Sequence, residues 1–147
     1  MLVRRLCRDL LFANPDADHV HIVATERDPV DGLALSSRNV YLSAEERSVA
    51  NTLYRALQAA ESGWLAGETK DACIRAAEVL VTGAVRGATS RGVEMKLDYI
   101  QMNDPDTFEI LDGQSRQSGE GGAVILSGAV WVGQTRLIDN IVVGHLG

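Results

Sequence analysis

The strongest constraint on this fold is a change of hydrophobic period near residue 93. Before it, apolar residues recur every three or four positions, as on one face of a helix: Val49, Leu53, Leu57, Ala60 and Trp64. After it, apolar residues alternate with charged ones, as on a half-buried strand: Met95, Leu97 and Tyr99 against Lys96 and Asp98. The chain therefore combines helices and strands in separate runs, which predicts an α+β fold.

Two helices are predicted before that change. Ser43 and Glu46 have the spacing of a capping box, so the first helix begins there and continues until Gly63 and Gly67 end it. The second runs from about Lys70 to Arg86. Its predicted packing face consists of Cys73, Ala76, Leu80 and Ala84. The two helices form a helical pair.

Three strands are predicted after it, near residues 95–102, 123–132 and 137–143, and the last two are joined at Gly133. We expect them to form a small antiparallel sheet against which the helical pair packs. Residues 113–122 are polar and glycine-rich, but they lack the lysine of a phosphate-binding loop of the Walker type and lead into an apolar run. They are interpreted as a mobile loop.

The first 30 residues have a different pattern. Leucines and arginines in "MLVRRLCRDLLF" are spaced as in a packed helix, and no small-residue cleavage site follows, so a targeting peptide is not favoured. The segment "HVHIVAT", residues 19–25, has the composition of a strand. A single helix-strand pair cannot close a parallel sheet, so we expect residues 1–30 to be the end of a larger domain and residues 31–147 a second one.

Composition excludes several function classes. A net charge of -6 disfavours a nucleic-acid partner, and no apolar run is long enough to span a membrane. Cys7 and Cys73 match no zinc or redox spacing, and the three histidines His19, His21 and His145 form no metal-site pattern. We expect no metal site, free thiols and a cytoplasmic location.

The stretch "GLALSSRNVYLSAEER" contains the candidate functional residues. Ser36, Ser37, Arg38 and Asn39 offer hydroxyl, guanidinium and amide donors that suit phosphate oxygens, and none of them is an obvious proton-transfer group. This set suits nucleotidyl transfer, in which the protein positions a polyphosphate and balances charge on the leaving pyrophosphate. Alternatively, these residues only shape a turn in a non-catalytic interaction module. A third interpretation is a regulatory nucleotide-binding domain, for which the same motif is the only support.

The longer string "ERDPVDGLALSSRNVYLSAEER" resembles the signature of the pantoate-beta-alanine ligase family. The resemblance extends from "RRLCRDLLF" through "LDYIQMND" to "GQTRLIDNIVV". It implies a Rossmann-type nucleotidyltransferase domain, here represented by residues 1–30, followed by a C-terminal lid domain. It also implies a cytoplasmic, homodimeric, AMP-forming ligase of pantothenate biosynthesis, which joins pantoate and beta-alanine through a pantoyl adenylate with ATP and Mg²⁺ as the substrate complex.

The resemblance also assigns residues. Leu35, Ser36, Ser37 and Arg38 would lie along the ATP phosphates as a KMSKS-like loop, with Arg38 as the catalytic charge partner, and the backbone of Glu26 would lie against the adenine. Two departures qualify it. The "DPV" insertion before Asp31 adds one residue, so this loop is expected to take another path. His-x-Gly-His and Lys-Asp-x-x-Gln motifs are absent, so the N-terminal half of the ligase is expected to be missing and the chain alone to be inactive.

Overall fold

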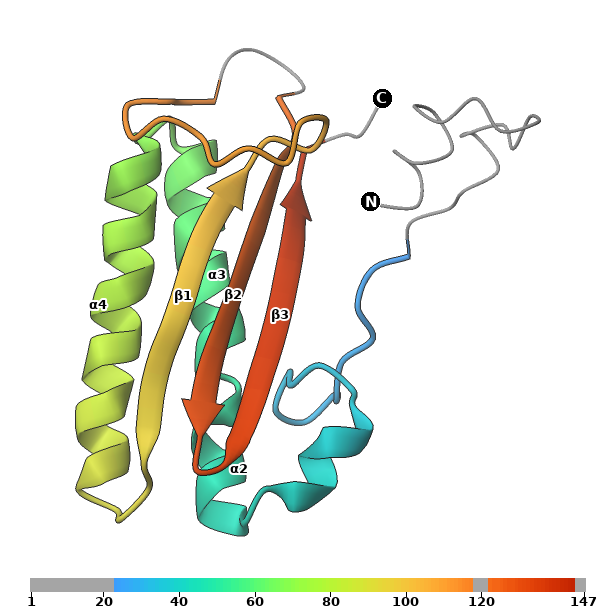
Figure 1. Cartoon of the computed structure of the whole chain (residues 1–147), viewed down its shortest axis with the longest axis vertical. Helices are drawn as coiled ribbons and strands as arrows, with labels where there is room; N and C mark the ends of the chain where they lie inside the picture. The colour runs from blue at the N-terminus through green and yellow to red at the C-terminus, as the bar shows by residue number, and fades with distance from the viewer. Residues whose placement is uncertain (1–22, 118–121, 145–147) are drawn as a thin grey trace.

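The computed structural model describes residues 23–117 and 122–144. In the described sequence, the helices come first and the strands follow. They are η2 (Ser37–Tyr41), α2 (Ala44–Ala50), α3 (Thr52–Leu65), α4 (Lys70–Thr89), β1 (Met95–Asn103), β2 (Val124–Val132) and β3 (Thr135–Val143). Figure 1 shows α3 and α4 side by side behind one face of the sheet, with residues 23–42 beside the β3 edge. The predicted α+β fold, a helical pair on a three-stranded antiparallel sheet, is confirmed.

The predicted helix start at Ser43 is also confirmed. The Ser43 hydroxyl accepts from the Glu46 amide, and the Glu46 carboxylate accepts from the Ser43 amide, which completes the capping box. The helix is not continuous, however. Asn51 separates α2 from α3: its ψ of -2° departs from the helical value, and its side-chain amide donates to the Asp31 carbonyl at 2.9 Å.

The end of α3 differs in one respect from the expectation. Gly67 does terminate the helix: it has a φ of 82°, its amide donates to Trp64, and the amide of Glu68 donates to Gly63, which is a Schellman motif. Gly63 itself lies inside α3. A Cβ there would lie 3.2 Å from the Cys73 sulfur, so this glycine permits close approach of α4 instead of ending the helix.

The predicted packing face of α4 is wrong: most of its residues lie one position before a residue that is buried or partly buried. The residues that it buries are Cys73, Ala77, Val81 and Ala88. Ala76 is exposed, while Leu80 and Ala84 are only partly buried. The helix begins at Lys70 as expected, with the Thr69 hydroxyl accepting from the Ala72 amide, but it continues to Thr89. Repeated steps of four keep one stripe against α3 and the sheet.

The three strands occupy the predicted positions, and the sheet order is β1-β2-β3 with antiparallel pairing throughout. The strict alternation predicted for β1 fails after Leu97. Asp98 is an extra residue in the register between Leu97 and Tyr99, a β-bulge that reverses which side chains face the helices. Ile100 and Met102 are therefore buried, and Tyr99 lies on the opposite face of the sheet.

The core lies between the helices and the inner sheet face. Its largest fully buried side chains are Leu57, Met102, Leu126, Val81, Val130, Val132 and Cys73. Burial raises the pKa of the Cys73 thiol, and the charge of Glu68 adds to the rise. None of the helices described combines the length and apolar content that a bilayer span requires.

Several predictions fall on residues that the structure does not describe. The helix over residues 1–12, most of the strand at 19–25, Cys7, His19, His21 and His145 lie outside the described residues. Only the first part of the polar loop is described, and it is hydrogen-bonded to α4: the carbonyls of Gly113 and Ser115 accept from the amides of Asp71 and Lys70. These two hydrogen bonds attach the first part of the glycine-rich loop to the start of α4.

Candidate functional site

The residues assigned to ATP by the resemblance lie in residues 23–42, which we call the site segment. It runs beside the β3 edge of the sheet (Figure 1). Arg27 and Ala34 form an isolated antiparallel bridge, and the Leu35 amide donates to the Glu26 carbonyl at 2.9 Å. Glu26 and Leu35 are therefore direct neighbours, although a loop separates them in sequence.

The loop between them contains the "DPV" insertion and forms a closed turn. The Asp28 carbonyl accepts from Gly32 at 2.8 Å, where Gly32 has a φ of 72°, and the Asp28 amide donates to Leu33 at 2.9 Å. Arg47 of α2 bridges Asp28 and Asp31 at 2.8 and 2.9 Å. The residues Asp28, Pro29 and Val30 therefore lie in a hydrogen-bonded turn, and Glu26 pairs with Leu35 next to it.

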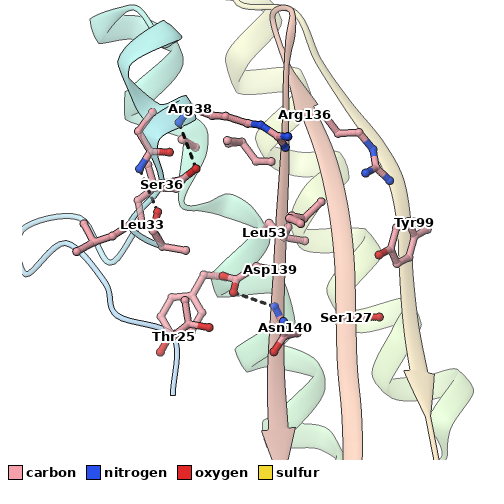
Figure 2. Close-up of a pocket in the computed structure, with 17 residues that line it drawn as sticks. Thr25, Leu33, Ser36, Arg38, Leu53, Tyr99, Ser127, Arg136, Asp139 and Asn140 are labelled. Carbon is pink, nitrogen blue, oxygen red and sulfur yellow. Dashed lines mark hydrogen bonds between the residues drawn. The ribbon is translucent and has the colours of Figure 1, made fainter. Parts of the chain in front are cut away.

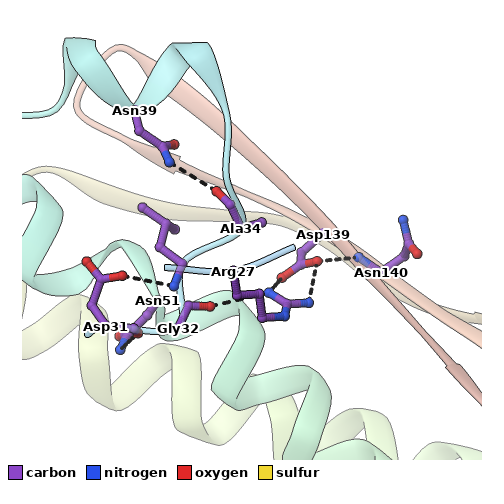
Figure 3. A network of polar contacts seen from close by, with 9 residues as sticks. Arg27, Asp31, Gly32, Ala34, Asn39, Asn51, Asp139 and Asn140 are labelled. Carbon is purple, nitrogen blue, oxygen red and sulfur yellow. Dashed lines mark hydrogen bonds and ion pairs between the residues drawn. The ribbon is translucent and has the colours of Figure 1, made fainter. Parts of the chain in front are cut away.

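Two polar residues of the motif stabilise the local backbone. The Ser36 hydroxyl caps η2 by accepting from the Arg38 amide at 3.2 Å. The Asn39 side-chain amide donates to the Ala34 carbonyl at 3.0 Å, and its oxygen is buried with no partner among the described residues. Figure 3 shows Asn39 above the segment that it holds. For these two side chains, the turn-shaping alternative describes what the structure contains.

Ser37 and Arg38 have no such local role. Both are exposed, and in the part of the chain that the structure describes neither side chain makes an ion pair or a hydrogen bond of its own. In Figure 2 the Arg38 side chain extends from η2 toward β3. Among the described residues, no partner uses the N–H donors of its guanidinium, and these donors suit an anion.

An ion pair attaches the site segment to the sheet. The Arg27 guanidinium donates two hydrogen bonds to the Asp139 carboxylate of β3, at 2.6 and 2.9 Å, and lies 3.5 Å from the Tyr54 ring centroid. The two charged side chains are 16% and 6% exposed. Figure 3 shows this pair linking the segment to β3. Bidentate geometry and an aromatic face fix the guanidinium in one orientation.

Three cavities adjoin the site segment. One of about 320 Å³ is bordered by Leu35, Ser36 and Arg38 together with Tyr99, Arg136 and Asn140 (Figure 2). A second of about 740 Å³ lies on the other side of Arg38. A third of about 690 Å³ is bordered by Glu26 and shares Thr25, Tyr54 and Asn140 with the first. Of the assigned residues, Ser37 borders none of these three cavities.

Sequence reasoning did not single out Arg27, Tyr54, Arg136 or Asp139. Arg27 and Asp139 each occur in a string that carries the family resemblance, but they are 112 positions apart. No spacing rule links residues at that separation, so their pairing emerges only when β3 and the site segment meet. In the described ranges, no group of three or more His, Cys, Asp or Glu residues is arranged to hold a metal ion.

Comparisons with known proteins support the resemblance. A profile of the family described as pantoate-beta-alanine ligase matches residues 1–142. A pantothenate synthetase of Thermotoga neapolitana is 40% identical over 143 residues, which is 97% of this chain and 45% of that protein. The chain belongs to the pantoate-beta-alanine ligase family.

Two further relatives agree with this membership. A pantothenate synthetase of Thermobifida fusca is 42% identical over 95% of this chain and 42% of its own length. A crystal structure of the Thermus thermophilus enzyme superposes with a TM-score of 0.67 at 37% identity, over 95% of this chain and 44% of that one. The chain thus spans less than half the length of the curated relatives it matches.

Proposed function

We propose that this chain is the C-terminal part of an ATP-dependent ligase that joins pantoate and beta-alanine. In this reaction pantoate and ATP form a pantoyl adenylate with release of pyrophosphate, and the amine of beta-alanine then displaces AMP to give pantothenate. The chain would contribute the loop along the ATP phosphates and a lid over the reacting groups. Family membership supports this proposal, and so does Arg38, which is exposed beside two cavities and has no side-chain partner among the described residues.

Arg38 is the proposed catalytic residue of this chain. Negative charge moves onto the leaving pyrophosphate as the adenylate forms, and a fixed guanidinium stabilises that charge. Ser37 would donate its hydroxyl to the same phosphates, and Leu35 and Ser36 would border them through their backbone. The Ser36 hydroxyl oxygen accepts from the Arg38 amide, which leaves its proton available for a phosphate oxygen.

The base of ATP is assigned to the cavity beside Glu26. That cavity shares Thr25, Tyr54 and Asn140 with the one beside Arg38, so a single elongated nucleotide suits the pair. The Glu26 carbonyl accepts from Leu35, while no backbone bond from the Glu26 amide is seen in the described residues. Mg²⁺ would enter with the nucleotide phosphates, because the described residues supply no ligand cluster of their own.

The way in which the loop is attached supports the proposed lid role. Arg27 and Asp139 join the site segment to β3, so the loop and the helix-sheet layer would move together. Closure of such a body over the phosphates would bring Arg38 onto them and exclude water from the adenylate.

The chain by itself is expected to bind ATP only weakly and to make no pantothenate. Charge-assisted hydrogen bonds contribute about 1.5 to 3 kcal/mol each, and association costs about 4 kcal/mol or more. Three contacts therefore leave only a few kcal/mol, where about 4 kcal/mol corresponds to millimolar affinity. Contacts exposed to solvent contribute less than this.

The proposal is tested with a fusion in which this chain replaces the matched segment of the Thermotoga neapolitana pantothenate synthetase. The fusion should form pantothenate, AMP and pyrophosphate from pantoate, beta-alanine and ATP, whereas the chain alone should form none. A folded fusion without activity would contradict the ligase proposal and favour a non-catalytic module. Turnover by the chain alone would contradict the expectation that it needs the facing domain.

A further inference from the structure

Two cationic side chains border both cavities on either side of Arg38. Among the residues described, Arg38 and Arg136 are the only ones common to the cavity of about 320 Å³ and the cavity of about 740 Å³. Arg38 was assigned to the ATP phosphates by resemblance, but Arg136 has no role in the function proposed above. Figure 2 shows Arg38 reaching β3 from η2, while Arg136 extends from β3 in the direction of Tyr99.

Arg136 lies on the sheet face that no described helix covers. It pairs with Trp131 across the β2-β3 hairpin. Its neighbour Leu137 pairs with Val130, and Leu137 and Val130 are both buried against the helices. Alternation along β3 therefore directs Arg136 away from the core. Trp131 is 39% exposed beside it, so an aromatic side chain and a guanidinium meet at the larger cavity.

Asp98 orients the guanidinium without using all of it. The Nε atom of Arg136 donates to one Asp98 oxygen at 2.9 Å, and its Nη2 atom lies 2.7 Å from the same oxygen. Asp98 is the extra residue of the β1 bulge, which displaces it from the regular alternation. A guanidinium has five N–H donors, and within the described ranges both donors on Nη1 are left for another acceptor.

The surrounding charges permit a bound anion. On the open face Glu46 lines the larger cavity, and one of its carboxylate oxygens accepts from the Ser43 amide. Asp139 is already neutralised by Arg27. The Arg136 and Asp98 side chains are 40% and 38% exposed, and such surface pairs are weak, so an anion competes with Asp98 at little cost.

We propose that Arg136 is a second polyphosphate-binding residue, which holds the phosphate chain from β3 while Arg38 holds it from η2. This inference rests on the proposed function and assigns it a residue that the sequence motif does not contain. Two guanidiniums on different elements would fix the direction of the phosphate chain along the sheet edge.

The test uses the isotope-labelled chain, inorganic tripolyphosphate as the probe and backbone amide NMR. Tripolyphosphate should shift amides near Arg38 and near Arg136 with one common saturation curve. Arg136→Gln and Arg38→Gln should each weaken the apparent affinity about tenfold, the loss expected for one charge-assisted contact. Arg86→Gln removes the same charge from the exposed face of α4 and should leave the affinity unchanged.

The opposite outcomes are equally specific. Wild-type affinity in Arg136→Gln, shifts confined to the Arg38 loop, an equal loss in Arg86→Gln, or no response of the wild-type chain would each overturn the assignment of Arg136. None of these results bears on whether the fusion makes pantothenate, so failure of this inference and failure of the ligase proposal are distinguishable.

Discussion

The helix-sheet layer and the site segment are stabilised by different interactions. The layer buries apolar side chains from α3, α4 and all three strands, and Thr52 is the one buried polar residue found in the described ranges. The site segment buries only Leu33 among its described residues. It is held by Arg27 on Asp139, Arg47 on Asp28 and Asp31, and side-chain bonds to its backbone.

This difference separates stability from the geometry of the site. Apolar burial is strong but non-directional, so it stabilises the layer without fixing any one polar group. Hydrogen bonds and bidentate ion pairs are directional, so they fix where Arg38 is presented. Changes in the two regions should therefore have different effects, and the following variants test that expectation.

The largest loss of stability should come from the layer. Leu57 is 0% exposed at the centre of α3, and Leu57→Ala should lower the free energy of unfolding by about 2 to 5 kcal/mol because it leaves a cavity. Urea unfolding measures this. Val79→Ala, at a position 72% exposed on α4, is the matched control and should change stability by less than about 0.5 kcal/mol. Equal effects would contradict the assigned core.

Breaking the ion pair that links the two regions should lower the free energy of unfolding less than Leu57→Ala does. It should loosen the site segment more than the helix-sheet layer. Asp139→Asn removes the charge that faces the partly buried Arg27, which should cost about 2 kcal/mol. Hydrogen exchange at the Leu35 amide should accelerate more than exchange in α3.

Asp98→Asn is the control for that variant. It breaks the exposed pair with Arg136 and should cost less than about 1 kcal/mol. If both variants lost the same stability, or if exchange at Leu35 were unchanged in Asp139→Asn, the ion pair would not be what holds the site segment.

The capping box marks the boundary between the two regions. Ser43→Ala removes the acceptor of the Glu46 amide and should cost about 1 kcal/mol, the usual value for a lost N-cap. Thermal unfolding provides the measurement. Ser62→Ala, whose hydroxyl only bonds back to Gln58 within α3, should be close to neutral. A neutral Ser43→Ala would show that the start of α2 is set by its contacts alone.

The smallest expected change in the free energy of unfolding concerns Cys73 at high pH. Its thiol pKa is raised by burial, so the unfolded chain loses that proton first, and stability should fall as the pH rises above the ordinary thiol value of about 8.5. Urea unfolding from neutral to alkaline pH measures the slope, which Cys73→Ala should reduce. An unchanged slope in Cys73→Ala would assign the alkaline loss to other groups.

Local sequence patterns predicted most of the fold because they reflect local physics. The capping box at Ser43, the apolar stripe of α3 and the alternation in β3 each depend on residues close in sequence. The predictions are wrong where contacts between residues distant in sequence determine the local structure. The helix is interrupted at Asn51, where the side chain reaches Asp31, and the bulge at Asp98 reverses the face on which Tyr99 lies.

The candidate site was only partly predictable for the same reason. The motif from Leu35 to Arg38 is contiguous, so resemblance locates it in the sequence. The ion pair of Arg27 with Asp139 and the cavities shared by Arg38 and Arg136 join segments that meet only in the folded chain. The phosphate roles of Leu35 to Arg38 and the adenine role of Glu26 stay predictions that binding experiments must test.

The most direct test of the central claim is pyrophosphate release in a single turnover of the fusion enzyme. Arg38→Ala should slow adenylate formation by about a hundredfold or more, the loss typical of one group that stabilises transition-state charge, while Arg86→Ala should react like the parent fusion. A near-normal rate in Arg38→Ala would contradict the proposed mechanism, because Arg38 is the catalytic charge partner that this chain is proposed to supply.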